Sequence, residues 1–170
     1  MREVLIAMED TKHPRLSESL QDYLEAVYLL VQRHSVARMK EIAALIGVGK
    51  SSVTGAMQAL AERGLVHYEP YQYVTLTPDG ETIGRMLLRR HRVLKRFLME
   101  VLGVPEQEAE TIGCKMEHVI KGDVLARFVQ FLQFAERWPC GGGSLAEAFE
   151  GFLQETAGAA PDGMTKGECR

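Results

Sequence analysis

The 170-residue sequence has few of the features that mark secreted or membrane proteins. It contains only three cysteines, which are widely spaced, and a single tryptophan. Three isolated cysteines do not form a disulfide framework, so a reducing, cytoplasmic location is expected. No stretch approaches the ~20 consecutive apolar residues that a membrane-spanning helix needs, so no membrane partner is expected. The 46% of hydrophobic residues are enough for the core of one or two small domains.

The chain also lacks a strong overall charge, but its charges are unevenly distributed. The formal net charge is −3. Residues 33–96 carry 11 Lys and Arg against 5 Asp and Glu, a net charge of +6, so the rest of the chain carries −9. This distribution suggests that one part meets phosphate and another meets cations or a partner subunit. An unevenly charged, solvated surface is the simpler alternative.

The spacing of apolar residues predicts a mostly α-helical fold with one β-hairpin. Helices are expected at residues 17–33, 39–46, 51–62, 78–102, 105–119, 122–136 and 144–153. Gly47 should end the second helix, and Ser51 or Ser52 should open the third. Residues 65–77 are rich in β-branched and aromatic side chains around Glu69-Pro70, which predicts the hairpin.

This pattern divides the chain into four regions. We expect an N-terminal arm at 1–15, a winged helix-turn-helix domain at 16–77, and an all-helical metal-binding and dimerisation domain at 78–137. Residues 138–170 should form a Gly-rich turn, a short helix and a flexible tail.

The order helix, short helix, Gly-containing turn, helix and hairpin is typical of a winged helix-turn-helix that binds double-stranded DNA. In the third helix Val53, Met57 and Leu60 can pack inward. The candidate DNA contacts are Lys50, Ser51, Ser52, Thr54, Gly55, Gln58 and Tyr73, with Tyr71 and Gln72 beside the last of these at the hairpin tip. Small hydroxyl side chains allow a helix to approach bases and phosphates closely. Serines that merely cap a helix are the alternative.

Metal-binding types of side chain recur at helical spacing. The candidate ligands are Asp22, Glu25, His91, Cys114, Glu117 and His118. The last three lie at i, i+3 and i+4, and the first two at i and i+3, so each set projects from one helical face. Carboxylate, imidazole and thiolate together suit first-row transition metals, whereas calcium or magnesium would prefer oxygen alone. Taken singly, each residue could instead be an ordinary surface or core side chain.

From about Leu16 to Gln133 the chain resembles the DtxR/MntR family of metal-dependent transcriptional repressors, the iron- and manganese-dependent regulators. The resemblance rests on Asp22-Tyr-Leu-Glu25-Ala-Val-Tyr28, Ser51-Ser-Val-Thr54, Leu76-Thr-Pro-Asp-Gly80, Arg90-His91-Arg92 and Cys114-Lys-Met-Glu117-His118. It implies a winged-helix domain followed by a helical dimerisation domain, with metal between them. Matched residue by residue, it assigns Asp22, Cys114, Glu117 and His118 to the principal site. It assigns Glu25 and His91 to a neighbouring ion.

The sequence mixes the two branches of that family. Cys114 resembles the iron branch, where manganese sensors carry a carboxylate, and Asp22 resembles the manganese branch, where iron sensors carry methionine. Lys95 stands where the iron branch has a carboxylate, and Glu110, one turn before Cys114, is a candidate additional ligand. The expected cofactor is Fe2+ or Mn2+, for which Co2+, Ni2+ or Zn2+ could substitute. No organic cofactor is expected.

The sequence therefore predicts a homodimeric, metal-activated repressor of metal homeostasis genes, not an enzyme. Its dimer surface is expected at Leu94, Leu98, Val101, Leu125, Phe128 and Leu132, although these residues could instead fill the core of a monomer. One alternative is a MarR-like winged-helix regulator that senses a small organic ligand. Another is a small metal-dependent hydrolase with Glu117 or Glu25 as general base.

Overall fold

The computed structural model describes residues 16–69, 73–120, 122–136 and 145–156. Its elements are α2 (Glu18–His34), α3 (Met39–Ile46), α4 (Lys50–Glu62), β1 (Val66–His67), β2 (Thr75–Leu76), α5 (Pro78–Glu100), α6 (Glu106–Glu117), α7 (Gly122–Ala135) and α8 (Leu145–Thr156). The expected arm at 1–15, the tip residues Tyr71 and Gln72, Cys140, Cys169 and the tail beyond α8 lie outside the described residues. None of the described helices has the length and apolar character that crossing a bilayer requires.

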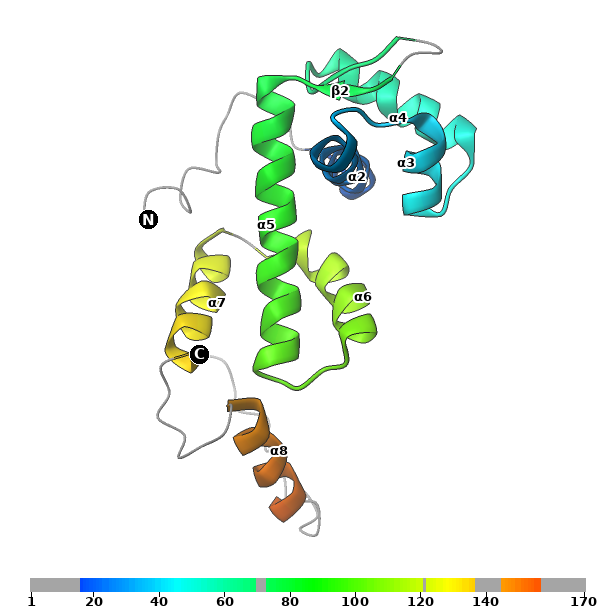
Figure 1. Ribbon diagram of the computed structural model, residues 1–170. Coiled ribbons are helices and arrows are strands. Elements are labelled where there is room, and N and C mark those ends of the chain that lie inside the picture. The colour runs from blue at the N-terminus through cyan, green and yellow to red at the C-terminus, as the bar shows by residue number, and fades with distance from the viewer. Residues whose placement is uncertain (1–15, 70–72, 121, 137–144, 157–170) are drawn as a thin grey trace, which may run out of the picture.

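The long helix α5 connects two groups of elements (Figure 1). Helices α2, α3 and α4 and the hairpin lie at its N-terminal end, and α6 and α7 flank its C-terminal half. The mostly helical fold class predicted from the sequence is confirmed, with a winged-helix arrangement in the first group. The strands pair antiparallel with Val66 opposite Leu76, and Ala37 adds an isolated bridge to Val74.

Local capping explains several of the helix boundaries. The Ser17 hydroxyl accepts a hydrogen bond from the Leu20 amide at 3.4 Å, and Thr77 accepts one from the Gly80 amide at 3.0 Å. Gly47 ends α3 with a φ of 79°, in the left-handed region that favours glycine. The prediction that Ser51 or Ser52 opens the third helix is wrong. That helix begins at Lys50 with Gly49 as its N-cap, and no side chain caps it.

A continuous apolar core joins α2, α3, α4 and the hairpin. Its buried side chains include Val53, Met57 and Leu60, which face inward from α4 as predicted. At the start of α5 the backbone approaches this core closely. A Cβ on Gly80 would lie 1.8 Å from the carbonyl oxygen of Leu65, and one on Gly84 would lie 2.7 Å from Cβ of Tyr28. Only glycine at these positions lets the start of α5 pack this closely against Leu65 and Tyr28.

A second apolar contact forms between the C-terminal half of α5 and α7. Phe97 and Phe128 meet edge to face with ring centroids 4.7 Å apart. The side chains expected at the dimer surface are instead mostly internal, since Leu94, Leu98, Val101, Leu125 and Leu132 are all buried within one chain. Their assignment to a dimer surface is therefore wrong. Their apolar spacing fits a monomer core equally well, so the sequence could not separate the two roles.

Candidate metal centre

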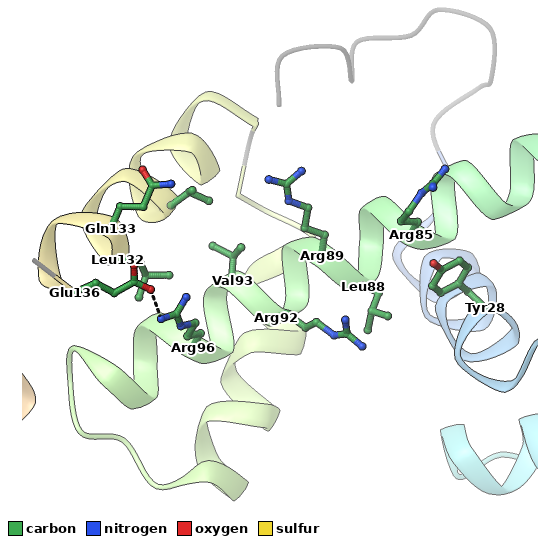
Figure 2. Close-up of a pocket in the computed structure, with 11 residues that line it drawn as sticks. Tyr28, Arg85, Leu88, Arg89, Arg92, Val93, Arg96, Leu132, Gln133 and Glu136 are labelled. Carbon is green, nitrogen blue, oxygen red and sulfur yellow. Dashed lines mark hydrogen bonds and ion pairs between the residues drawn. The ribbon is translucent and has the colours of Figure 1, made fainter. Parts of the chain in front are cut away.

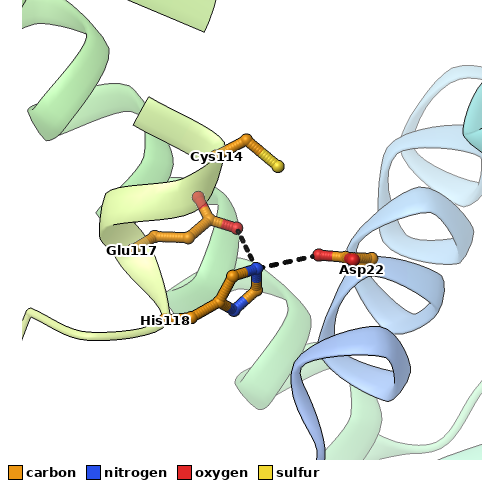
Figure 3. A group of neighbouring side chains, drawn as sticks. All are labelled: Asp22, Cys114, Glu117 and His118. Carbon is orange, nitrogen blue, oxygen red and sulfur yellow. Dashed lines mark ion pairs between the residues drawn. The ribbon is translucent and has the colours of Figure 1, made fainter. Parts of the chain in front are cut away.

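Three helices converge where the N-terminal group of elements meets the C-terminal group. Asp22 and Glu25 project from α2, His91 from α5, and Cys114 and Glu117 from the last turn of α6. His118 follows directly as the C-cap residue of α6. Figure 3 shows Asp22 of α2 facing Cys114, Glu117 and His118 across the gap between α2 and α6. The structure thus brings all six predicted ligands together from segments far apart in sequence.

The six side chains form two overlapping groups. One consists of Asp22, Cys114, Glu117 and His118, and the other of Glu25, His91 and Glu117; each residue offers a donor atom within 4.8 Å of the others in its group. Glu117 is common to both and is only 1% exposed. Its Oε2 lies 2.9 Å from Nδ1 of His91, and its Oε1 lies 3.9 Å from Nε2 of His118. A carboxylate buried so deeply requires positive or hydrogen-bonding partners on both oxygens.

The orientation of His118 is set by residues of α2. Its Nε2 lies 3.1 Å from Oδ1 of Asp22, and its Nδ1 lies 3.3 Å from Oε1 of Gln21. Because an amide oxygen only accepts, Nδ1 donates to Gln21, and Nε2 is directed at Asp22 and Glu117. Gln21 was not among the candidate site residues. Its position directly before Asp22 on α2 is the one signal in the sequence that could have indicated it.

The electrostatics of the cluster oppose negative charge. Burial, followed by the neighbouring Glu117 carboxylate, raises the pKa of Glu25 to about 7. Burial also raises the pKa of Asp22, although His118 acts against this. Burial and the surrounding carboxylates raise the pKa of the Cys114 thiol to about 11. Because their pKa values are raised, these acidic side chains keep their protons more readily than they would in water. A divalent ion would supply the positive charge that the cluster lacks. With thiol, imidazole and carboxylate donors so close together, the site fits a first-row transition metal.

Glu110 lies beside this cluster but belongs to neither group. Its Oε1 lies 3.2 Å from Nε2 of His91, and its Oε2 lies 2.7 Å from Nζ of Lys95. The hydrogen bond from Lys95 lowers the pKa of Glu110. Lys95 also pairs with Glu106 at 2.9 Å. Both oxygens of the Glu110 carboxylate therefore already have partners, one in His91 and the other in Lys95.

A cavity of about 540 Å³ lies elsewhere, between α5 and α7 (Figure 2). Four arginines from one face of α5 contribute to its lining: Arg85, Arg89, Arg92 and Arg96. Arg96 is bound to Glu136 at 2.6 Å. The lining contains no cysteine or histidine, so the cavity has no soft or imidazole metal donor.

The candidate DNA contacts lie together on α4 and the hairpin, which pack side by side (Figure 1). On α4 the exposed residues are Lys50, Ser51, Ser52, Gly55 and Gln58, and Thr54 is half-buried. A Cβ on Gly55 would meet nothing within 4 Å, so the helix surface is open there. Tyr73 is 58% exposed, and the guanidinium of Arg38 lies 5.2 Å from its ring centre. Arg38 is a basic side chain that the sequence reasoning missed.

Two family models match successive parts of the chain. The one described as iron dependent repressor, N-terminal DNA binding domain, matches residues 15–74. The one described as iron dependent repressor, metal binding and dimerisation domain, matches residues 77–145.

Individual proteins support the same relationship. The HTH-type transcriptional regulator MntR of Lysinibacillus sphaericus is 36% identical over 121 residues, which cover 71% of this chain and 86% of that protein. An uncharacterized HTH-type transcriptional regulator of Methanocaldococcus jannaschii is 35% identical over 119 residues, covering 69% of this chain and 95% of that one. A solved manganese-dependent transcriptional repressor in complex with manganese is 32% identical, with a TM-score of 0.62. This chain spans about half of its length, 53%, and the match covers 68% of this chain.

These matches confirm the resemblance seen in the motifs, and they favour neither the hydrolase nor the sensor of an organic ligand. The chain belongs to the iron-dependent repressor family, whose members are metal-dependent transcriptional regulators that bind DNA and dimerise.

Proposed function

We propose that Asp22, Glu25, His91, Cys114, Glu117 and His118 hold the activating metal, and that this ligation switches the chain into the form that binds operator DNA. The observation that carries the proposal is the pair of donor groups that share Glu117 between α2 and α6. Asp22, Cys114, Glu117 and His118 would hold one ion. Glu25, His91 and Glu117 would hold a second, with one carboxylate oxygen of Glu117 directed to each site.

The ligands connect the two halves of the molecule. Asp22 and Glu25 belong to α2, whose opposite face lies in the winged-helix core. Cys114, Glu117 and His118 belong to the end of α6. When donors from both helices share an ion, α2 is fixed relative to α6, and the orientation of α4 is fixed with it. In a dimer, two recognition helices must lie about 34 Å apart to enter successive major grooves, so fixing this orientation favours DNA binding.

The DNA surface in this proposal consists of α4 and the hairpin. Lys50 lies at the first position of α4, where a positive side chain and free backbone amides both favour phosphate. The hydroxyl of Thr54 donates to the carbonyl of Lys50 at 3.0 Å. Together with Ser51, Ser52, Gly55 and Gln58 it would meet the major groove. Tyr73, whose ring lies under the guanidinium of Arg38, would reach the sugar-phosphate backbone of the DNA next to that groove. A repressor acts where its DNA is, so a cytoplasmic location is part of the proposal.

The homodimer would use apolar side chains that remain exposed on the C-terminal half. These are Leu102, Val119, Val124, Phe131 and Phe134. Phe131 and Phe134 lie with ring centroids 5.8 Å apart on α7, and Phe131 also contacts Phe97 at 5.7 Å. Exposed apolar side chains, with two neighbouring aromatic rings among them, favour a subunit interface. They replace the buried leucines that the sequence had suggested.

The identity of the metal depends on a mixture of donors. Cys114 supplies sulfur, which favours iron, cobalt, nickel or zinc, whereas Asp22 and Glu25 supply oxygens that suit manganese. The similar repressor of known structure binds manganese, and the matching family models are named for iron. We propose that both Fe2+ and Mn2+ activate this chain, with a slight preference for iron. A cobalt complex should then show sulfur-to-metal charge transfer that Cys114→Ser abolishes, and identical spectra would remove Cys114 from the ligand set.

The decisive experiment is operator binding with and without metal. A random duplex library selected in the presence of Mn2+ supplies the operator. Its affinity is then measured with chelator and with manganese, ferrous iron, cobalt or zinc, the ferrous samples being kept anaerobic. We expect tight binding only when metal is present. Equal affinity under all conditions would overturn the proposal. Binding that occurs only in the presence of chelator would overturn it too, because metal would then release the DNA.

A further inference from the structure

A chain of three side chains runs outward from the second metal group. His91 is buried between α2, α5 and α6, and its two ring nitrogens face different carboxylates. Nδ1 lies 2.9 Å from Oε2 of Glu117, and Nε2 lies 3.2 Å from Oε1 of Glu110. The other oxygen of Glu110 lies 2.7 Å from Nζ of Lys95. Starting from the cluster, the contacts therefore run from His91 to Glu110 and from Glu110 to Lys95.

We propose that Glu110 is a positioning residue for the metal centre and not one of its ligands: anchored by Lys95, it accepts the proton on Nε2 of His91 and so directs Nδ1 at the metal. This inference rests on the proposed function, because it requires an ion at Glu25, His91 and Glu117.

The donor geometry decides which nitrogen of His91 faces the ion. A neutral imidazole carries a proton on one nitrogen and a lone pair on the other. Glu25 and Glu117 form the rest of the group, and Nδ1 is the nitrogen beside Glu117. An ion bound by this group would therefore take the lone pair of Nδ1, and the proton would then lie on Nε2. Glu110 stabilises this tautomer, since its carboxylate can only accept a hydrogen bond.

Lys95 prevents the other arrangement, in which Glu110 turns inward as a ligand. Such a movement would break the 2.7 Å contact between Oε2 of Glu110 and the lysine. Lys95 is further held by Glu106 at 2.9 Å, and Gly113 of α6 lies beside the Lys95 backbone. A fixed ammonium thus keeps one carboxylate oxygen turned away from the cluster and leaves the other for His91.

The test is the tautomer of His91 in the metal-loaded protein. Zinc, which is diamagnetic, is added to full-length protein labelled with 15N at histidine, and the imidazole nitrogens are observed by NMR. We expect His91 to carry zinc on Nδ1 and a proton on Nε2. Zinc on Nε2 with the proton on Nδ1 would overturn the inference, because Glu110 would then lie on the metal side. Zinc-dependent shifts at His118 but not at His91 would show that no ion binds at Glu25, His91 and Glu117. That result would overturn both the inference and the proposed second ion. No shift at either histidine would overturn the proposed function as well.

Two variants with the same change in charge sharpen the test. Glu110→Gln should lower the affinity for manganese at the second ion by about tenfold, the low end for residues that orient a ligand, because Glu110 is half-exposed. Glu106→Gln removes the other carboxylate bound to Lys95 but does not touch His91, so it should leave that affinity and the His91 spectrum unchanged. Equal losses in both variants would mean that only overall charge matters, and would overturn the positioning role.

Discussion

The two sides of α2 face opposite kinds of environment. One side places Tyr23, Leu24, Val27 and Leu30 in the apolar core of the winged helix. The other side carries Asp22 and Glu25 toward α6, where Glu117 is almost fully buried. Burial of apolar surface favours the folded state without any ligand. Burial of like charges opposes it unless a cation is present. Helix α2 thus joins the winged-helix core, which is stable without a ligand, to a charged cluster whose stability depends on a bound cation.

The first prediction sharpens this comparison on the apolar side. Leu60 is fully buried in the winged-helix core, so Leu60→Ala should lower the free energy of unfolding by about 2–5 kcal/mol. Chemical denaturation with chelator and with manganese should show the same loss, because no metal donor touches this residue. Leu45 is 48% exposed on α3, and Leu45→Ala is the matched control that should change stability little. A loss at Leu60 that manganese restores would contradict the separation of the two regions.

The second prediction concerns the charged side. Glu117→Gln keeps the size of the side chain and removes its charge from both donor groups. Residues that merely orient a ligand change metal affinity by 10–100-fold, so loss of a shared ligand should cost more than about 100-fold. Calorimetric titration with manganese measures this loss, and denaturation of the chelated protein should show that the fold is retained. Glu108→Gln, an exposed substitution on the same helix, should bind metal normally. Equal affinities would refute the assignment of Glu117.

The difference between the winged-helix core and the charged cluster also explains how much of the fold and of the metal site could be predicted from the sequence. Helix positions and the winged-helix order follow from local signals such as the Ser17 cap, Gly47 and the Thr77-Pro78 start. Five of the six candidate ligands could be named because they stand at helical spacing, and His91 was assigned through the family resemblance of Arg90-His91-Arg92. The shared role of Glu117 could not be predicted, since it depends on how α2, α5 and α6 converge in space.

Two further findings lay beyond the sequence for the same reason. Leu94 and Leu98 have the spacing of an exposed interface and of an internal core alike, and only packing against α6 and α7 shows that they are buried. Apart from its place directly before Asp22, nothing in the sequence marks Gln21 as a site residue, and nothing marks Arg38. Gln21 is placed against His118 by the fold, and Arg38 against Tyr73. Local sequence patterns therefore identify candidate core and site residues, whereas tertiary contacts determine which residues they meet.

A third prediction follows from the protons retained in the cluster. The pKa of Glu25 is raised from 4.5 to about 7, so the folded chain holds more protons than the unfolded chain between these values. Stability of the metal-free protein should therefore fall as pH rises through this window, by about 1–2 kcal/mol between pH 5.5 and 7.5. The raised pKa of His91 acts in the same direction. Denaturation of chelated protein measures the slope.

The matched variants isolate the contribution of Glu25 to that slope. Glu25→Gln resembles the protonated side chain at every pH and should flatten the dependence. Glu81→Gln, an exposed substitution on α5, should leave it unchanged. Stability that is equal at both pH values in the wild-type protein would mean that the charged region does not hold protons in place of metal.

The smallest effect is expected on the DNA side, at Lys50. This exposed residue begins α4, where its charge and the free amides of the first turn can meet one phosphate. Lys50→Ala should therefore reduce the dependence of operator affinity on salt by about one phosphate, a change of about three- to fourfold between 50 and 200 mM salt. Binding should weaken on all sequences alike, because a phosphate contact carries no base information. The ratio of affinities with and without manganese should not change, since Lys50 is remote from the donor groups. Lys115→Ala removes an equal charge from α6 and should leave the salt dependence intact. If the two variants behaved alike, the DNA surface would extend along the whole chain, and the separation between a DNA-facing half and a metal-facing half would not hold.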